Sequence, residues 1–177
     1  MTEFSRPFPL ETLSAEPRPV DIQAQPAELE ALARRFGLSA IHSLAAEAQL
    51  RRSGEAVTAT GRLSARVTQS CVVSGEPVEA AVEEDFEIGF RPQPAEVRPE
   101  EEIELGENEL DVIFYEGGAI DLGEAAAQTL ALSLDPYPRS PAAEAAAREA
   151  GLKSEEEARM ESSPFAALAA LKGKLEE

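Results

Sequence analysis

The stretch that decides the fold runs from Glu109 to Pro141 and reads ELDVIFYEGGAIDLGEAAAQTLALSLDPYPRSP. Its first part, Asp111–Tyr115, is rich in β-branched and aromatic residues and predicts a short strand. The strand ends at Gly117–Gly118, a glycine pair that is typical of a turn. A strand and a turn therefore precede residues 121–134.

A helix is predicted over residues 121–134. The Asp121 side chain can accept hydrogen bonds from the first free N–H groups of this helix, and the charge of Glu124 complements its positive end. The apolar stripe consists of Leu122, Ala126 and Leu130. Pro136 and Pro138 prevent the helix from continuing. Asp121, Leu122, Glu124 and Pro136 thus form a structural motif without a nucleophile, a metal cluster or a phosphate-binding loop.

Two segments of alternating polarity lie upstream, at residues 57–73 and 78–90. Such alternation predicts two strands, each with one buried and one solvated face. The turn at residues 74–77 makes them an antiparallel hairpin. If the turn pairs Val73 with Val78, then Arg66 lies opposite Asp85, close enough for cross-strand attraction.

The N-terminal part predicts one or two short edge strands within residues 4–24, because proline there alternates with short apolar runs. Residues 26–36 predict a helix that begins at Pro26 and is capped by Gly37. The alanines of residues 38–52 favour a helix, but the alternation of apolar and polar residues there predicts a further strand. Together these elements predict an α+β fold, in which an antiparallel sheet, curled toward a barrel, is covered by two or three helices.

The chain of 177 residues predicts a single domain with a tail. We expect the α+β domain to span residues 1–138 and to contain an acidic mobile loop at 93–108. A polar flexible linker follows at 139–162. The last predicted element, at 163–175, is a C-terminal amphipathic helix that can dock on its own domain or bind a partner.

The net charge of −18 argues against a general affinity for DNA, for RNA phosphates and for anionic membrane surfaces. It favours attraction to a basic partner. A single cysteine excludes an internal disulfide and, with the lack of a signal-peptide pattern, favours a cytoplasmic setting. No apolar run approaches the length of a membrane span.

The charge is unevenly distributed along the chain. Residues 76–116 hold fifteen acidic residues against two arginines, whereas residues 29–69 hold six arginines against three glutamates. The candidates for binding RNA or another partner therefore come from the second region: Arg51, Arg52, Arg62 and Arg66. For Arg62 and Arg66, pairing with Glu83, Asp85 and Glu87 is the favoured alternative. The candidates for binding a basic partner are Glu100, Glu101, Glu102 and Glu104.

No catalytic constellation or metal site is expected. Cys71 falls on the apolar side of a strand and is interpreted as a buried small residue. His42 has no cysteine or carboxylate at ligand spacing, and one histidine with one cysteine cannot make a usual zinc site. We therefore expect no cofactor and no enzymatic activity.

The block at residues 109–141, the upstream VTQSCVVSGEPVEAAVEEDFEIGF and the tail SPFAALAALK together resemble the YceD family, over roughly residues 3 to 172. Its members are called large ribosomal RNA subunit accumulation proteins. Many members follow the proline-rich stop with a cysteine cluster that looks metal-binding. Here the same place reads Tyr137-Pro138-Arg139-Ser140-Pro141-Ala142, so a zinc role does not carry over.

Two functions remain open. The resemblance implies a non-enzymatic ribosome biogenesis factor that supports accumulation of large-subunit ribosomal RNA by binding precursor RNA, an assembling basic ribosomal protein, or both. The charge alone favours an acidic interaction module that shields a basic protein without contacting RNA. The identity of the partner and the oligomeric state do not follow from the residues.

Overall fold

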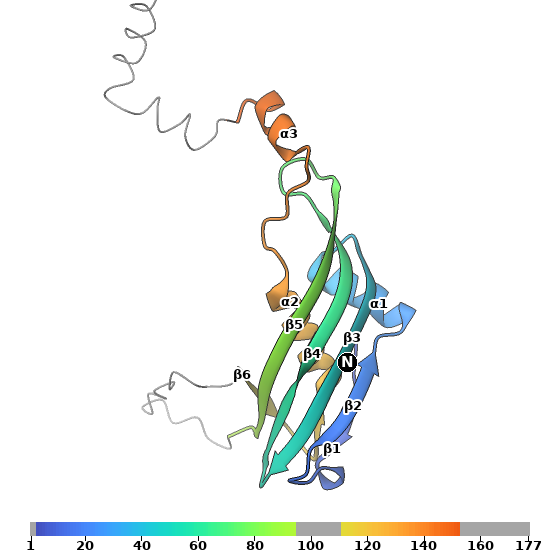
Figure 1. Ribbon diagram of the computed structural model, residues 1–177, viewed down its shortest axis with the longest axis vertical. Coiled ribbons are helices and arrows are strands. Elements are labelled where there is room, and N and C mark those ends of the chain that lie inside the picture. Colours follow the sequence, from blue (N-terminus) through green and yellow to red (C-terminus); the bar gives the residue numbers. More distant parts are fainter. Residues whose placement is uncertain (1–2, 95–110, 153–177) are drawn as a thin grey trace, which may run out of the picture.

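The computed structural model describes residues 3–94 and 111–152 (Figure 1). In this part of the chain the main sheet has five strands in the order β2-β3-β4-β5-β6, and a second, two-stranded sheet pairs β1 with β7. The strands are β1 (Pro7–Pro9), β2 (Arg18–Gln23), β3 (Ala40–Ser53), β4 (Ala56–Ser70), β5 (Pro77–Pro92), β6 (Asp111–Tyr115) and β7 (Ala119–Asp121). The helices are η1 (Leu10–Thr12), α1 (Pro26–Phe36), α2 (Leu122–Ser133) and α3 (Ala143–Glu149).

The α+β fold class is confirmed, but the main sheet is open. It ends at β2 on one side and at β6 on the other, and it does not close into a barrel. β3, β4 and β5 are long and curve together in Figure 1. Both α1 and α2 lie behind this sheet in that view, whereas α3 lies at the far tip of the β4–β5 hairpin.

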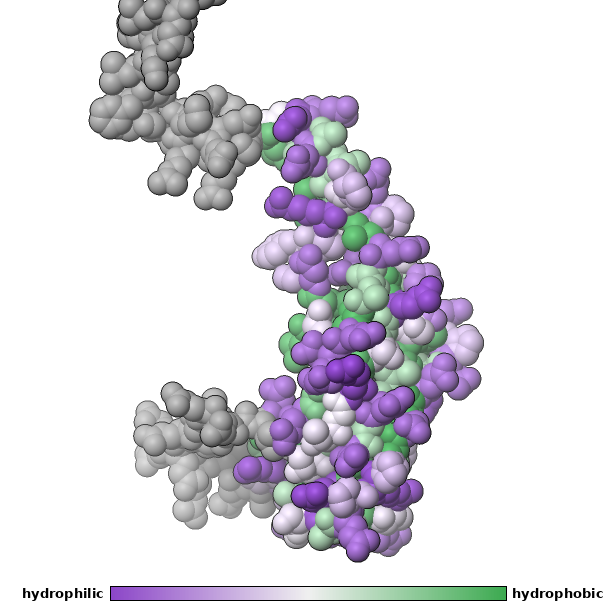
Figure 2. All heavy atoms as spheres, in the orientation of Figure 1, coloured by the Kyte–Doolittle hydropathy of each residue, from purple (hydrophilic) through white to green (hydrophobic). Residues whose placement is uncertain are grey.

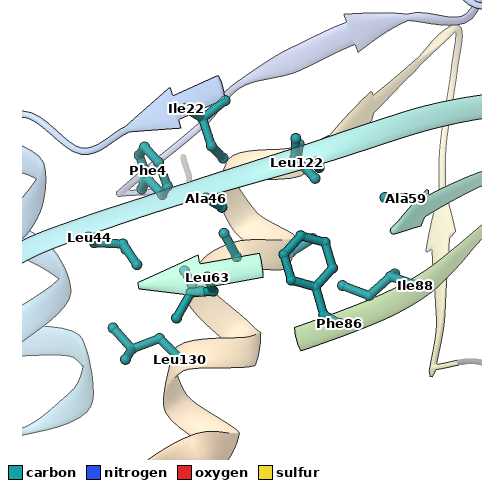
Figure 3. Close-up of a cluster of buried hydrophobic side chains, with 14 of the residues drawn as sticks. Phe4, Ile22, Leu44, Ala46, Ala59, Leu63, Phe86, Ile88, Leu122 and Leu130 are labelled. Atoms are coloured by element: carbon teal, nitrogen blue, oxygen red, sulfur yellow. The ribbon is translucent and has the colours of Figure 1, made fainter. Parts of the chain in front are cut away.

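The core fills the space between the sheet and the two covering helices. Alternate residues of each long strand face inward because successive side chains point to opposite faces of a strand. Figure 3 shows this cluster, in which Leu44, Leu63, Phe86, Leu122 and Leu130 meet. Leu44, Leu63, Leu122 and Leu130 have no exposed surface. The core is aliphatic and alanine-rich, with few aromatic side chains.

The predicted α1 has the expected bounds. Gln25 and Glu28 form a capping box at its start, and Gly37 at its end adopts the left-handed conformation with φ of 66°. Arg6 adds a link to this helix, because its guanidinium donates to both carboxylate oxygens of Glu28 at 2.7 and 2.8 Å. The N-terminal segment is thereby fastened to the helix.

The register predicted for the β4–β5 hairpin is wrong. Arg62, not Arg66, lies opposite Asp85, and Arg66 lies opposite Ala81. The last pair before the loop joins Ser70 with Pro77, so the loop includes residues 71–76 and is longer than the four-residue turn that we expected. Cys71 and Val73 belong to this loop instead of the strand.

Two further pairings differ from the sequence-based expectation. β6 pairs with β5 in parallel, so the main sheet is mixed instead of wholly antiparallel. Residues 119–121, between the predicted turn and the predicted helix, form a short strand that was not expected, β7, which pairs with β1. Most of the expected mobile loop, the end of the expected linker and the expected tail helix lie outside the described residues. Residues 139–152 of the linker include α3.

Candidate protein-interaction face of the sheet

The face of the main sheet that points away from α1 and α2 is called the outer face here. Hydrophilic side chains cover most of it, with smaller apolar areas between them (Figure 2). One row of paired residues crosses four strands: Asp21 pairs with Glu47, Glu47 with Arg62, and Arg62 with Asp85. Because residues in register on neighbouring strands lie side by side, one cation stands among three carboxylates.

Arg62 is engaged by Asp85 on the neighbouring strand. Its Nε and Nη2 groups donate to the two carboxylate oxygens at 2.7 and 3.0 Å. Both side chains are well exposed, at 61% and 73%. The guanidinium holds the pKa of Asp85 below its usual range, mainly through this hydrogen bonding. Glu47 and Asp21 lack such a partner among the ion pairs of the described residues.

A trough of about 720 Å³ lies at this point of the outer face. Four carboxylates and one guanidinium line it: Asp21, Glu47, Asp85, Glu87 and Arg62. Its lining also includes Ala48, Gly61 and Phe86, which are in register across β3, β4 and β5. The trough is therefore acidic, and only part of its charge is neutralised from within.

Gly61 marks a very close approach of β4 to β3. A Cβ atom placed on Gly61 would lie 2.1 Å from the Glu47 carbonyl oxygen and 2.8 Å from Ala48 Cα. No side chain can occupy this space, so glycine is required for the two backbones to come together.

The four arginines predicted as binding residues do not form one cluster. The guanidinium of Arg52 is bound within the chain, because it donates hydrogen bonds to the carbonyl oxygens of Leu10 at 2.6 Å and Gly54 at 2.8 Å. Arg51, Arg62 and Arg66 alternate onto the outer face and are exposed. Within the described part of the chain, Arg51 and Arg66 form no ion pair.

The acidic residues predicted to bind a basic partner, Glu100, Glu101, Glu102 and Glu104, lie outside the described residues. Asp121, Leu122 and Glu124 of the predicted motif lie at the N-terminus of α2. Asp121 Oδ1 accepts from the N–H groups of Gly123 and Glu124, and Leu122 is fully buried. Pro136 follows the end of α2 at Ser133.

Asp21 and Glu47, which line the trough, were not among the residues predicted for binding. The alternation of residues 38–52 already places Glu47 on the polar side of its strand. The position of Asp21 beside it depends on the register between β2 and β3, which are separated by α1. No local signal in the sequence could set that register.

Cys71 lies at the tip of the hairpin and is 3% exposed. Its Sγ accepts hydrogen bonds from the backbone N–H groups of Ser140 at 3.3 Å and Ser74 at 3.4 Å. These donors, Ser140 first, lower the pKa of Cys71, and burial opposes them. The segment that follows the proline-rich end of α2 therefore packs on Cys71, with Ser140 as the contact residue.

A family model matches residues 59–172, and its description reads large ribosomal RNA subunit accumulation protein YceD. This match covers more than half of the chain. The chain belongs to the YceD family. Searches of the curated proteins and of the solved structures return no significant match. For this YceD-family chain, a role in the accumulation of large-subunit ribosomal RNA follows from the family description.

Within residues 3–94 and 111–152, no group of three or more His, Cys, Asp or Glu side chains could hold a metal ion. None of the helices there is long and apolar enough to cross a membrane. His42 contacts Thr68 Oγ1 at 2.8 Å on an exposed part of the sheet, whereas Cys71 contacts Ser74 and Ser140.

Proposed function

We propose that the protein supports large-subunit ribosomal RNA accumulation without catalysis, by holding a basic segment of an assembling ribosomal protein on the outer face of its sheet. The observation that carries this proposal is the acidic trough, in which four carboxylates surround one arginine. A ribosomal protein is a fitting partner because a protein that binds RNA must carry many lysines and arginines.

The charge of the trough favours such a partner. Arg62 is held by Asp85, while Asp21, Glu47 and Glu87 are exposed and form no ion pair with other described residues. Lysine or arginine side chains can approach these carboxylates without first displacing another cation. The net charge of −18 adds a long-range attraction that raises the rate of association and weakens with salt.

Direct binding of precursor ribosomal RNA is the second candidate. Arg51 and Arg66 favour it, because both are exposed on the outer face and form no ion pair with other described residues. The carboxylates around them work against it, since binding to phosphates depends on a positive contact surface. We therefore place the protein partner first.

The proposal is tested by measuring binding of purified basic large-subunit ribosomal proteins at low salt and at about 0.5 M salt. A triple variant, Asp21→Asn with Glu47→Gln and Glu87→Gln, removes three charges from the trough and keeps the Arg62–Asp85 pair. We expect it to weaken binding by about tenfold or more. The matched control, Glu11→Gln with Glu16→Gln and Glu30→Gln, changes exposed carboxylates elsewhere and should shift affinity by less than about twofold.

A gel mobility shift with large-subunit precursor RNA at physiological salt separates the two candidates. We expect weak or no binding. Sub-micromolar binding that is lost in the double variant Arg51→Glu, Arg66→Glu would reject the protein-holding mechanism in favour of direct RNA contact. Equal affinities of the trough variant and its control for every ribosomal protein would reject the trough as the binding surface.

A further inference from the structure

β6 is the last strand of the main sheet at the side opposite to β2. Among the described residues its one neighbour in the sheet is β5, with which it pairs in parallel from Asp111 to Tyr115. In Figure 1, β6 lies beyond β5 at the border of the sheet. An edge strand has N–H and C=O groups on its open side that can pair with another extended segment.

The residues with open backbone groups can be identified. The carbonyl oxygen of Tyr115 accepts from the N–H of Gln93, at the end of β5, at 3.0 Å. Tyr115 and the residues at even spacing from it therefore direct their backbone groups toward β5. Since successive residues alternate, Val112 and Phe114 direct theirs toward the open edge. No turn or loop hydrogen bond between described residues uses the backbone of either one.

The same two residues have exposed apolar side chains. Val112 is 37% and Phe114 50% exposed, although residues of this type are usually buried. Both alternate onto the outer face, where Val112 is in register with Gly89 and Phe114 with Arg91. Because Gly89 has no side chain, the residue of β5 in register with Val112 places no side chain beside it.

The opposite edge of the sheet has residues that oppose strand pairing, whereas Val112–Tyr115 of β6 do not. β2 begins with Arg18 and Pro19 and has Asp21 at its centre, and charged residues and proline are the usual means by which edge strands avoid pairing. From Val112 to Tyr115, β6 has no charged residue, no proline and no bulge. The contrast singles out β6 as the edge that is open to a partner.

We propose that β6 receives an extended, basic segment of the partner protein as an additional strand of the main sheet. This inference rests on the proposed function for the basic nature of the partner. The added strand pairs with the backbone of Val112 and Phe114, and their side chains contact alternate residues of the segment. Asp111 and Glu116, both exposed at the ends of β6, attract its lysines or arginines, while Arg91 contributes the one opposing charge on β5.

A second copy of this chain is a poorer occupant of the edge. It has the same net charge of −18, so the approach of two copies is opposed by repulsion. A basic segment is instead attracted by this negative charge. Charge complementarity therefore decides between the two occupants.

The test uses a synthetic peptide of alternating lysine and valine, about eight residues long, which matches a strand added to a sheet edge. Its control has the same residues with every backbone amide N-methylated, so that the charge is unchanged but neither edge can donate hydrogen bonds. We expect the control peptide to bind at least about tenfold more weakly. On binding of the first peptide, the amides of Val112 and Phe114 should become protected from hydrogen exchange.

Variants of Phe114 separate the backbone from the side chain. Phe114→Ala keeps the open N–H group, whereas Phe114→Pro removes it and is tolerated where that group faces solvent. We expect binding to fall by a few-fold in the alanine variant and by about tenfold or more in the proline variant. Leu132→Ala, at a residue of α2 that is 82% exposed, should leave binding unchanged.

Equal binding of the two peptides would overturn the inference and leave the proposed function intact, because attraction to the acidic surface would remain. The comparison of the two peptides uses the wild-type protein, so it tests strand addition at β6 even if Phe114→Pro does not fold. Failure of both the peptide and the basic ribosomal proteins to bind would remove the proposed function as well. Tight binding of a single-stranded RNA oligonucleotide that is lost in Phe114→Ala would also overturn the inference, since Phe114 beside Arg91 would then be a base-stacking surface.

Discussion

Arg35 of α1 and Glu124 of α2 are joined by two hydrogen bonds, in which guanidinium N–H groups donate to both carboxylate oxygens at 2.8 and 2.7 Å. The pair is partly buried, with 33% of the arginine and 17% of the glutamate side chain exposed. Arg35 also donates to Glu3 at 3.0 Å. The two helices that cover the core are thus fastened to each other and to the N-terminal segment.

Replacing Glu124 by glutamine should lower the free energy of unfolding at neutral pH by about 1 kcal/mol, because a partly buried, doubly hydrogen-bonded pair is lost. Arg35 lowers the pKa of Glu124 below the usual 4.5. The stabilisation is therefore present above that value and is lost as the pH falls through the lower pKa of the folded protein.

Urea unfolding at pH values from about 7 to about 3 checks this prediction. The wild-type protein should lose more stability than Glu124→Gln over that interval. Glu30→Gln, at an exposed residue of α1, is the control and should follow the wild type within about 0.5 kcal/mol. Parallel pH profiles for wild type and Glu124→Gln would contradict the role of the pair.

The carboxylate of Asp121 accepts four hydrogen bonds at the start of α2. It accepts from the N–H groups of Gly123, Glu124 and Arg6, and from the Ser5 hydroxyl at 2.6 Å. Asp121→Ala should destabilise the protein by about 2 to 3 kcal/mol, because a helix cap and the link to the N-terminal segment are lost together.

Asp121→Asn keeps an oxygen acceptor in the same place, so its cost should be about half of that or less. Denaturant midpoints of the two variants measure the difference. If the two substitutions were equally harmful, the carboxylate charge and not the cap geometry would be the source of the stability.

Gly61→Ala should destabilise the protein by about 3 kcal/mol or more, because the added methyl group meets backbone atoms that cannot rotate away. Gly118→Ala is the matched control. A Cβ atom there has nothing within 4 Å, and its φ lies outside the left-handed region. The control should change stability by less than about 1 kcal/mol. A folded Gly61→Ala protein with wild-type stability would show that β3 and β4 do not approach this closely.

The sequence predicted those features that depend on neighbours along the chain. Asp121 could be recognised as a cap because its hydrogen bonds reach two and three residues ahead. The bounds of α1 follow from Pro26 and Gly37 in the same way. Alternation along β3, β4 and β5 assigned most side chains to the correct face of the sheet, because it needs no knowledge of the partner strand.

Features that depend on distant residues could not be predicted. The β4–β5 register leaves residues 71–76 as a loop in which Cys71 and Ser74 contact Ser140, and that contact joins residues 66 or more positions apart. The place of Asp21 in the trough needs the pairing of β2 with β3 across α1. The parallel pairing of β6 with β5 likewise joins residues more than twenty positions apart, such as Ile88 and Asp111, and no local pattern indicates it.

The contact between the hairpin tip and the segment after α2 makes the reactivity of Cys71 a measure of local opening. The Ser140 hydroxyl donates to Glu76 at 2.7 Å and lies 3.1 Å from the Ser74 hydroxyl, while the Val72 N–H donates to the Pro138 carbonyl at 2.9 Å. Cys71 can react with a bulky aromatic disulfide only when this contact opens, because its side chain is buried.

Ser140→Ala should raise the rate of that reaction by about fivefold to tenfold, which corresponds to the loss of about 1 to 1.4 kcal/mol of hydrogen bonding to a carboxylate. Ser64→Ala, at an exposed residue of β4, should leave the rate unchanged. Because a local opening exposes little surface, the rate in Ser140→Ala should depend only weakly on urea. A steep dependence on urea would instead show that Cys71 reacts through global unfolding, and the tip would then not open independently of the sheet.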